Sequence, residues 1–232
     1  MKTIDLRKAR ERQRREEYKE TILHAAESII VRKGYRATTM DDIAREAQFS
    51  KATLYNYFRS KGDLTYEIML HYFDDIKRSL AGIQGLDLDP MEKLKRTILT
   101  ILEVYDEREN LSRAIMMDDS EHGIMKAFVA EQKGTSSPVE KKFIKTMKAK
   151  RREILEMGCA IVRDGIRCGA FRDVDASSAM NFLNAVLQGV LHLRAWMDPK
   201  PGAREEAEMI FDFLLRGIEK EHAPSPLKGD SQ

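Results

Sequence analysis

The chain has 232 residues, of which 34% are charged and 42% hydrophobic, and its net charge is +2. Its length accommodates one large domain or two smaller ones. No apolar run approaches the roughly 20 residues that a membrane-spanning helix needs, and Met1–Ile4 do not open a signal-peptide pattern. We therefore expect a soluble, mostly helical protein of the cytoplasm with no membrane partner.

The charge is distributed unevenly along the chain. Residues 1–61 contain 15 Lys and Arg against 9 Asp and Glu, a net charge of +6, whereas residues 62–232 contain 25 against 29, a net charge of −4. A basic N-terminal part suits contact with nucleic-acid phosphates. Two interpretations of residues 1–16 stay open: a frayed, solvated helix start, or a basic arm that adds phosphate or minor-groove contacts. The cations of this segment are Arg7, Lys8, Arg10, Arg12, Arg14 and Arg15.

Three helix-start signals follow one another closely after a first helix that we expect from about Glu17 to Arg32. Thr39 with Asp42 approximates a capping box, Ser50 can cap a second helix, and Ser60 with Asp63 marks a third. The helices at Met40–Ala47 and Lys51–Phe58 are joined by only two or three residues. Two short helices joined so tightly must cross at a steep angle, which predicts a helix-turn-helix.

The helix predicted at Lys51–Phe58 suits a DNA groove. Leu54 and Phe58, four residues apart, should point into the core, because positions i and i+4 share a helix face. The opposite side then carries a lysine, tyrosine hydroxyls and short side chains that can meet phosphates and base edges. We expect Thr39, Tyr57 and Lys61 on phosphates, with Thr38 beside them, and the following residues nearer the bases: Lys51, Ala52, Thr53, Tyr55 and Asn56.

The residues around this motif resemble the tetracycline-repressor (TetR) family of bacterial regulators. The resemblance rests on the segments 22–26, 33–35, 38–44, 50–58 and 60–61, within residues 17–77. One departure is Gln48, where the family usually has glycine in the turn, and a glutamine adopts a left-handed conformation only at some cost. The resemblance implies an all-α chain, with an N-terminal three-helix helix-turn-helix DNA-binding domain and a C-terminal helical domain for ligand binding and dimerisation. The loop around Gly82, Gly85 and Pro90 is the predicted boundary.

The predicted C-terminal domain spans residues 83–222 and shows helical patterns without a strand signal, followed by a disordered tail at residues 223–232. Ala176–Met197 is apolar almost all round, so it must be buried on every side, and a partner subunit is a plausible cover. Together with the last helix it would form a four-helix interface between two subunits. The predicted dimer residues are Leu183, Leu187, Val190, Leu191, Ile210, Phe211, Leu214 and Ile218.

Methionines and phenylalanines gather in the same half of the chain. Thioethers fill irregular space and adapt to varied ligands, so either a loosely specified helical core or an apolar effector pocket explains them. We expect a hydrophobic or amphipathic small-molecule effector. The candidate pocket residues are Met116, Met117, Phe128, Phe143, Met147, Ile154, Met157, Ile161, Met180 and Phe182.

No catalytic constellation or cofactor motif is present in the sequence. Asp118 and His122 could share a helix face and bind a metal, although an exposed polar patch explains them more simply. Cys159 and Cys168 lie nine residues apart on one predicted helix, on opposite faces, so they cannot pair; packing or redox sensing stays open. The basic run at residues 145–152 fits a solvated helix face or the site of an anionic effector group.

These patterns predict a homodimeric transcriptional regulator, most simply a repressor, that binds a palindromic operator in double-stranded DNA and is released by its effector. An architectural DNA-binding protein without an effector, or an enzyme with a DNA-binding head, would be the alternatives. The absence of catalytic groups from the sequence disfavours the enzyme.

Overall fold

The computed structural model describes residues 6–108, 110–111, 124–194, 197 and 200–218. In this part of the chain the regular elements are all α-helices, as predicted. The contacts divide the chain into two compact units, and each is built from two separate segments. Unit 1 contains residues 1–75 and 107–151, and unit 2 contains residues 76–106 and 152–232. The loop around Gly82, Gly85 and Pro90 lies within unit 2, and the functional boundary placed there stays a prediction.

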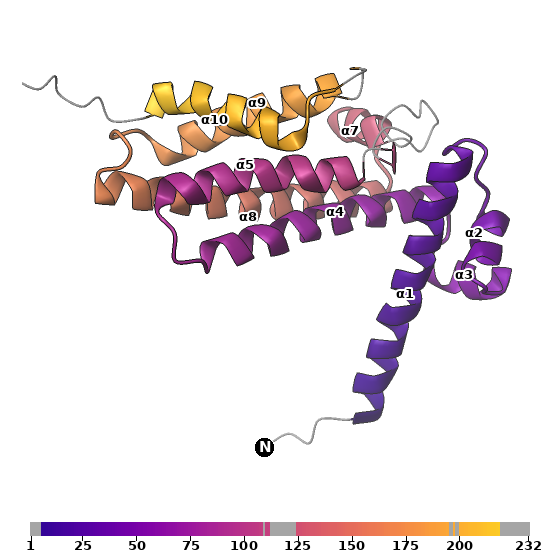
Figure 1. Cartoon of the computed structure of the whole chain (residues 1–232). Coiled ribbons are helices and arrows are strands. Elements are labelled where there is room, and N and C mark those ends of the chain that lie inside the picture. The colour runs from indigo at the N-terminus through magenta and orange to yellow at the C-terminus, as the bar shows by residue number, and fades with distance from the viewer. Residues whose placement is uncertain (1–5, 109, 112–123, 195–196, 198–199, 219–232) are drawn as a thin grey trace, which may run out of the picture. The chain divides into compact units, whose positions relative to one another are not determined.

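Helix α1 spans Leu6–Lys33 as one continuous helix (Figure 1). It begins eleven residues before the predicted start at Glu17, so residues 6–16 of the basic segment are helical. Gly34 ends the helix in the left-handed conformation at φ 81°, and its amide donates to the carbonyl of Ile30 at 2.9 Å. A glycine is favoured at this position because it has no Cβ to clash.

The core of unit 1 is built on the helices that follow. Helices α2 (Met40–Glu46) and α3 (Lys51–Tyr57) are short, and α4 (Lys61–Gln84) is long. Every one of these helices contributes a fully buried aliphatic side chain, and α1 supplies the remaining wall; the largest are Ile22, Ile30, Ile43, Leu54, Leu64 and Ile68. This shared core fixes α2 and α3 against the two long helices.

Charged contacts add to the packing of α1 on α4. The guanidinium of Arg108 lies 3.1 Å from a Glu27 carboxylate oxygen on α1 and 2.6 Å from that of Asp75 on α4. Lys19 on α1 also pairs with Glu67 on α4. These partly buried pairs connect the same two helices at two places, eight residues apart along each helix.

A second cluster in unit 1 lies where α4 meets α7 (Ile124–Gln132) and α8 (Pro138–Cys168). The rings of Tyr66 and Phe143 stack with centroids 4.4 Å apart, and Ala127, Ile144 and Met147 complete the cluster. Burial raises the pKa of Tyr66 to about 12, so its phenol is neutral at physiological pH.

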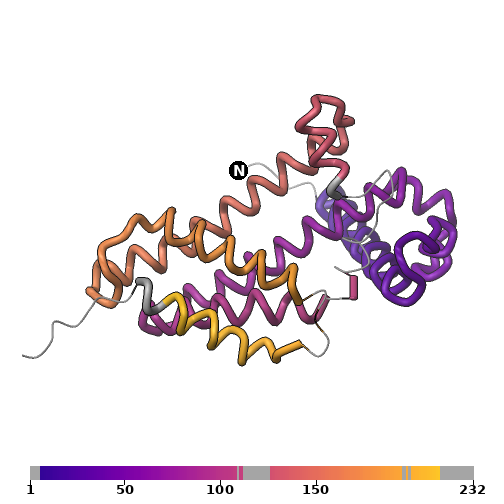
Figure 2. The backbone as a smooth tube through the Cα atoms, turned by 90° about the horizontal axis from the view of Figure 1, so that it is seen from above, coloured from indigo at the N-terminus to yellow at the C-terminus, as the bar shows by residue number. Residues whose placement is uncertain are grey.

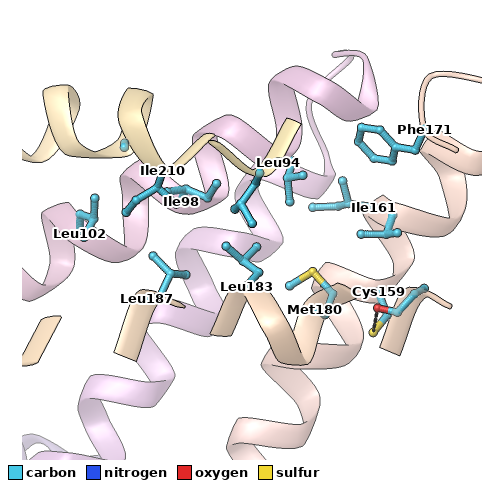
Figure 3. Close-up of a cluster of buried hydrophobic side chains, with 14 of the residues drawn as sticks. Leu94, Ile98, Leu102, Cys159, Ile161, Phe171, Met180, Leu183, Leu187 and Ile210 are labelled. Atoms are coloured by element: carbon cyan, nitrogen blue, oxygen red, sulfur yellow. Dashed lines mark hydrogen bonds between the residues drawn. The ribbon is translucent and has the colours of Figure 1, made fainter. Parts of the chain in front are cut away.

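Unit 2 is a helical core formed by α5 (Pro90–Glu107), the C-terminal part of α8, α9 (Ala176–Arg194) and α10 (Ala203–Ile218). Figure 2 shows α9 and α10 running along one another. Figure 3 shows Leu94 and Ile98 of α5 with Leu183 and Leu187 of α9 in this core. Within each pair the two residues are four apart, which places them on one face of their helix. The helix predicted at Ala176–Met197 is confirmed over Ala176–Arg194.

One buried cation holds the ends of three helices of unit 2 together. Arg194, at the end of α9, is fully buried and donates to both carboxylate oxygens of Asp106 on α5 at 2.7 Å. It also pairs with Glu206 on α10 and donates to the carbonyl of Pro201 at 3.0 Å. A buried arginine needs such partners, because a charge without them is costly to remove from water. No pattern in the sequence indicated this cluster.

Two glycines of α8 allow a neighbouring side chain to pack closely against the helix. A Cβ at Gly165 would overlap the ring of Phe171, and a Cβ at Gly158 would overlap the terminal methyl of Met180. The ring is rigid and buried, whereas the thioether can rotate away. We expect Gly165→Ala to lower the free energy of unfolding by about 1–3 kcal/mol. Gly158→Ala should be near neutral, since alanine favours the helix by about 1 kcal/mol. Denaturant unfolding measures both, and equal losses would contradict the packing described here.

Candidate nucleic-acid interface

A capping box positions α2. The Thr39 hydroxyl oxygen accepts from the Asp42 amide at 3.1 Å, and the Asp42 carboxylate accepts from the Thr39 amide at 3.1 Å. Lys33 of α1 donates to the same carboxylate at 2.6 Å. These hydrogen bonds, led by that of Lys33, hold the pKa of Asp42 well below its usual range. The carboxylate is therefore ionised at neutral pH, and the predicted capping box is confirmed.

The turn after α2 depends on an unusual residue. Gln48 has a φ of 58°, and among the described residues other than glycine it alone has a positive φ. The amide of Phe49 donates to the Ala44 carbonyl at 2.9 Å, and that of Gln48 donates to the Arg45 carbonyl at 3.2 Å. This pair of bonds is the Schellman arrangement that ends a helix with a left-handed residue. Gln48 thus adopts the left-handed conformation in spite of its cost for a residue with a Cβ.

Helix α3 begins at a cap formed by Ser50, whose hydroxyl accepts from the Thr53 amide at 3.0 Å. Leu54 is fully buried in the unit 1 core, and Phe58 is buried just beyond the last turn. The other side of α3 is open to solvent: Lys51, Ala52, Tyr55 and Asn56 are exposed, and Thr53 and Tyr57 are partly exposed. A short helix held by two inward anchors therefore presents small and polar side chains outward, as a groove-reading helix requires.

The structure separates the other predicted DNA-binding residues by their contacts. Lys51 forms an exposed ion pair with Asp41 at 2.7 Å, and such a pair exchanges readily for a phosphate. Thr38 is buried and donates its hydroxyl to the Gly34 carbonyl at 2.7 Å, so its assignment to the DNA surface was wrong. This hydroxyl forms its hydrogen bond within the loop between α1 and α2.

Lys61 has a role that the sequence did not reveal. Its ammonium group donates to the carbonyl of Tyr35 at 2.6 Å and to that of Thr38 at 2.9 Å, and it lies 4.2 Å from the centroid of the Tyr35 ring. The first residue of α4 thereby fastens the loop that leads into α2. A phosphate contact for Lys61 stays a prediction, because it would compete with these carbonyls.

An aromatic cluster joins α1 to the turn and to α3. The ring of Tyr18 lies 5.0 Å from that of Phe49 and 6.4 Å from that of Tyr57, measured between centroids. Arg14 donates to the Tyr18 hydroxyl at 2.8 Å, and the guanidinium of Arg15 lies 5.2 Å from the centroid of Tyr57. Sequence reasoning missed Tyr18, although the arginine-rich stretch four residues before it was a usable signal.

Comparison with known proteins identifies the domain that carries this geometry. Residues 22–68 match the family model described as "Bacterial regulatory proteins, tetR family". The match covers α2, α3 and the parts of α1 and α4 that form their core. The chain is a transcriptional regulator of the TetR family.

Relatives and a solved structure extend the similarity along the chain. The chain is 29% identical over 157 residues to the uncharacterized HTH-type transcriptional regulator YhgD of Bacillus subtilis (strain 168), with 68% of this chain and 73% of that protein covered. It is 29% identical over 163 residues to the HTH-type transcriptional repressor KstR2 of Rhodococcus jostii (strain RHA1), covering 70% and 72%. The TetR-family regulator PfmR from Thermus thermophilus matches with a TM-score of 0.63 and 28% identity, over 86% of this chain and 99% of that one. This family and these relatives are regulators rather than enzymes.

The ten predicted pocket residues do not form one cluster in this TetR-family chain. Phe128, Phe143 and Met147 belong to the α4–α7–α8 cluster of unit 1, whereas Ile161 and Met180 lie in the core of unit 2. Phe182 is 58% exposed, so its assignment to a pocket was wrong. The side chains of Ile154 and Met157 are partly buried on α8. Met116 and Met117, like Asp118 and His122, lie outside the described residues.

Most of the predicted dimer residues lie in the interior of the subunit. Leu183, Leu187 and Leu191 of α9 and Ile210 and Leu214 of α10 are buried in the core of unit 2, with Val190 and Phe211 packed against it. The assignment of the five buried side chains to the dimer interface was wrong, because they occupy the inward faces of the two helices. Val190 and Phe211 are only partly buried, so their place in a dimer interface stays a prediction. The side chain of Ile218 is outside the described set. Among the described side chains of these two helices, the large apolar ones that are exposed are Phe182, Leu193, Met209 and Phe213.

The described residues include a surface hollow of about 490 Å³ in unit 2. Its wall combines aliphatic with charged side chains from the end of α4, the connection that follows it, α5 and α10: Ile83, Leu86, Glu92, Lys95, Arg96, Leu99, Thr100, Glu103 and Arg204. The two cysteines are also described: Cys159 is buried, where burial raises the pKa of its thiol, and Cys168 is exposed. None of the described helices is long and apolar enough to cross a membrane.

The turn between α2 and α3 yields a direct test. We expect Gln48→Gly to raise the free energy of unfolding by about 1 kcal/mol, because glycine adopts a positive φ without the Cβ clash. Ala47→Gly is the matched control, since Ala47 has an ordinary φ of −72° and should be destabilised by the same change. Thermal unfolding measures both variants. A loss of stability in Gln48→Gly equal to that of the control would contradict strain at Gln48.

Proposed function

We propose that this TetR-family regulator is a repressor that binds a palindromic operator as a homodimer and leaves it when a small molecule binds. The observation that carries the proposal is the exposed side of α3, where Ala52 and Asn56 lie one turn apart beside Lys51 and Tyr55. Short and amide side chains reach base edges in the major groove, and lysine meets guanine or phosphate. The relative KstR2 is named a repressor, which supports repression rather than activation.

Operator selection tests the DNA-binding part. Wild-type protein should select from a random duplex library a palindrome whose half-sites are about 34–36 Å apart or slightly more. Asn56→Ala should then change base preference at one position of each half-site, at a cost of about 1–3 kcal/mol. Tyr57→Phe should weaken all sequences alike and flatten the salt dependence, because it removes a phosphate contact. An Asn56→Ala variant that loses affinity equally on every sequence would contradict the base-reading role.

The dimer that we propose uses the exposed apolar side chains of α9 and α10. Phe213 is 72% exposed in the single chain, and Met209 one turn before it is 58% exposed. Phe182 and Leu193 are eleven residues apart on α9, close to three full turns, so they share one face. A partner subunit that covers these side chains would remove them from water at no cost to the core of unit 2.

Two neighbouring residues distinguish association from folding. We expect Phe213→Glu to convert the dimer to a folded monomer, because the charge would be buried without a partner in the interface. Leu214→Glu should unfold unit 2 instead, since Leu214 is 7% exposed within the core. Sedimentation and circular dichroism measure the two effects. A wild-type protein that sediments as a monomer at micromolar concentration, or a Phe213→Glu variant that stays dimeric, would overturn this interface.

The effector that we propose is an amphipathic small molecule. The hollow on unit 2 has a volume within the range of roughly 300–1,000 Å³ typical of ligand sites. Leu86 and Leu99 can contact an apolar group there, and Lys95 and Arg96 can contact an anionic one. Because α4 contributes residues to this hollow and also follows α3, a ligand that shifts α4 would change DNA binding.

A ligand screen tests this coupling. An effector should stabilise the fold by about 2.7 kcal/mol at a hundredfold excess over Kd, which raises the melting temperature. It should also lower operator affinity, because the two binding events are linked. We expect amphipathic acids to succeed and Lys95→Gln with Arg96→Gln to weaken them. Hits confined to sugars or nucleotides, or tight ligands that leave DNA affinity unchanged, would count against this effector class.

A further inference from the structure

The first turns of α1 form a basic helical extension, defined as residues 6–16. It contains six Arg and Lys and two Glu in eleven residues, a net charge of +4. Every residue of the extension is exposed, and the first buried residue of α1 is Ile22. The extension is about 16 Å long at 1.5 Å per residue. Its two glutamates can each meet a cation four residues away, as Arg7 with Glu11 and Arg12 with Glu16, but six cations against two acids leave most of the positive charge of the extension unbalanced within it.

The base of the extension is fixed beside the recognition helix. Arg14 donates to the Tyr18 hydroxyl through two nitrogens, at 3.1 and 2.8 Å, and Arg15 lies over the ring of Tyr57 on α3. Tyr18 in turn packs against Phe49 in the turn of the helix-turn-helix. A rigid helix that starts from these contacts cannot swing freely, so its cations keep a defined position relative to α3. Figure 1 shows α1 continuing past α2 and α3.

The face of α1 that covers the core becomes basic where it passes the core. Residues 8, 15, 22 and 29 recur every seven positions, which places them along one stripe of a helix. Ile22 is buried in the core that α2 and α3 share, and Ile29 is also buried, whereas Arg15 and Lys8 occupy the continuation of the same stripe and are exposed. The face of α1 that packs on the core is therefore basic in the first turns of the helix, beside α3.

We propose that the extension binds the phosphate backbone of DNA just outside the half-site that α3 contacts. Its length matches about five base pairs, because the rise is about 3.4 Å per base pair. Arginine and lysine neutralise phosphates without reading the base sequence. This inference rests on the proposed DNA-binding function, and it adds a second, sequence-independent contact to it.

The test removes four charges and leaves the anchors intact. The variant Arg7→Gln/Lys8→Gln/Arg10→Gln/Arg12→Gln keeps the helix, since glutamine has a similar helix propensity, and it keeps Arg14 and Arg15. Affinity is measured against salt on two duplexes: one ends at the selected half-sites, and the other extends about ten base pairs beyond each. Each phosphate contact contributes about 0.9 to the slope of log K against log salt. We expect the slope on the long duplex to fall by about 3–4 per half-site, with little change on the short one.

A matched variant controls for general charge effects. Lys141, Lys142, Lys145 and Lys148 are exposed on α8, and changing all four to Gln removes the same charge. This control should bind both duplexes like the wild type. An equal loss in the control would overturn the inference by showing a long-range effect of net charge. A loss that depends on the flanking base sequence would overturn the phosphate assignment.

The two hypotheses fail in different ways. If the wild type selects no operator, the proposed function fails. If the wild type binds its operator and the extension variant binds the long duplex with unchanged affinity and slope, the proposed function stands and this inference fails. Circular dichroism of the variant confirms that the helix is retained before either conclusion is drawn.

Discussion

The position of α3 depends on the burial of Leu54 and Phe58. A helix of seven residues is too short to be stable by itself in water, so tertiary packing must hold it. Leu54 lies in a core with Ile22 and Ile30 of α1, and Phe58 closes the end of the helix over the same core. Everything that α3 presents outward follows from these two inward contacts. The long helices α1 and α4 therefore hold the short helix α3 in place.

Several polar side chains near α1 and α4 that were predicted to contact DNA form hydrogen bonds within the protein. Thr39 completes a capping box, Thr38 is bound to a loop carbonyl, and the ammonium of Lys61 is held by backbone carbonyls. Such bonds set the angle at which α2 and α3 enter and leave their turn. Lys51 differs, because its partner Asp41 is as exposed as the lysine itself. Residue type alone therefore does not separate a phosphate ligand from a structural cap, whereas burial and hydrogen-bond partners do.

Burial likewise separates the apolar residues of unit 2 into those of its core and those on its surface. The inward faces of α9 and α10 are buried in a core that α5 and α8 share, and Arg194 fixes the helix ends through Asp106 and Glu206. What remains outside is a smaller set of large apolar side chains, including Phe182 and Phe213. Isolated apolar residues on a surface are ordinary, but side chains of this size on two adjacent helices fit an interface with another subunit. The hollow beside α5 and α10 borders that core through Leu99, and its wall mixes apolar with charged side chains.

The sequence by itself determined the local structure. The capping signals at Thr39 and Ser50, the glycine stop at Gly34 and the left-handed Gln48 are short-range features, and hydrogen bonds within a few residues decide them. Helical periodicity likewise predicted Leu54 and Phe58 as anchors. Only the tertiary structure decided which face of an almost wholly apolar helix lies inward, because α9 has several faces hydrophobic enough to be buried. It also decided that most of the basic segment extends α1, and that Thr38 and Arg194 are buried. These outcomes depend on side chains distant in sequence, such as Asp106 with Arg194, whose proximity no local pattern encodes.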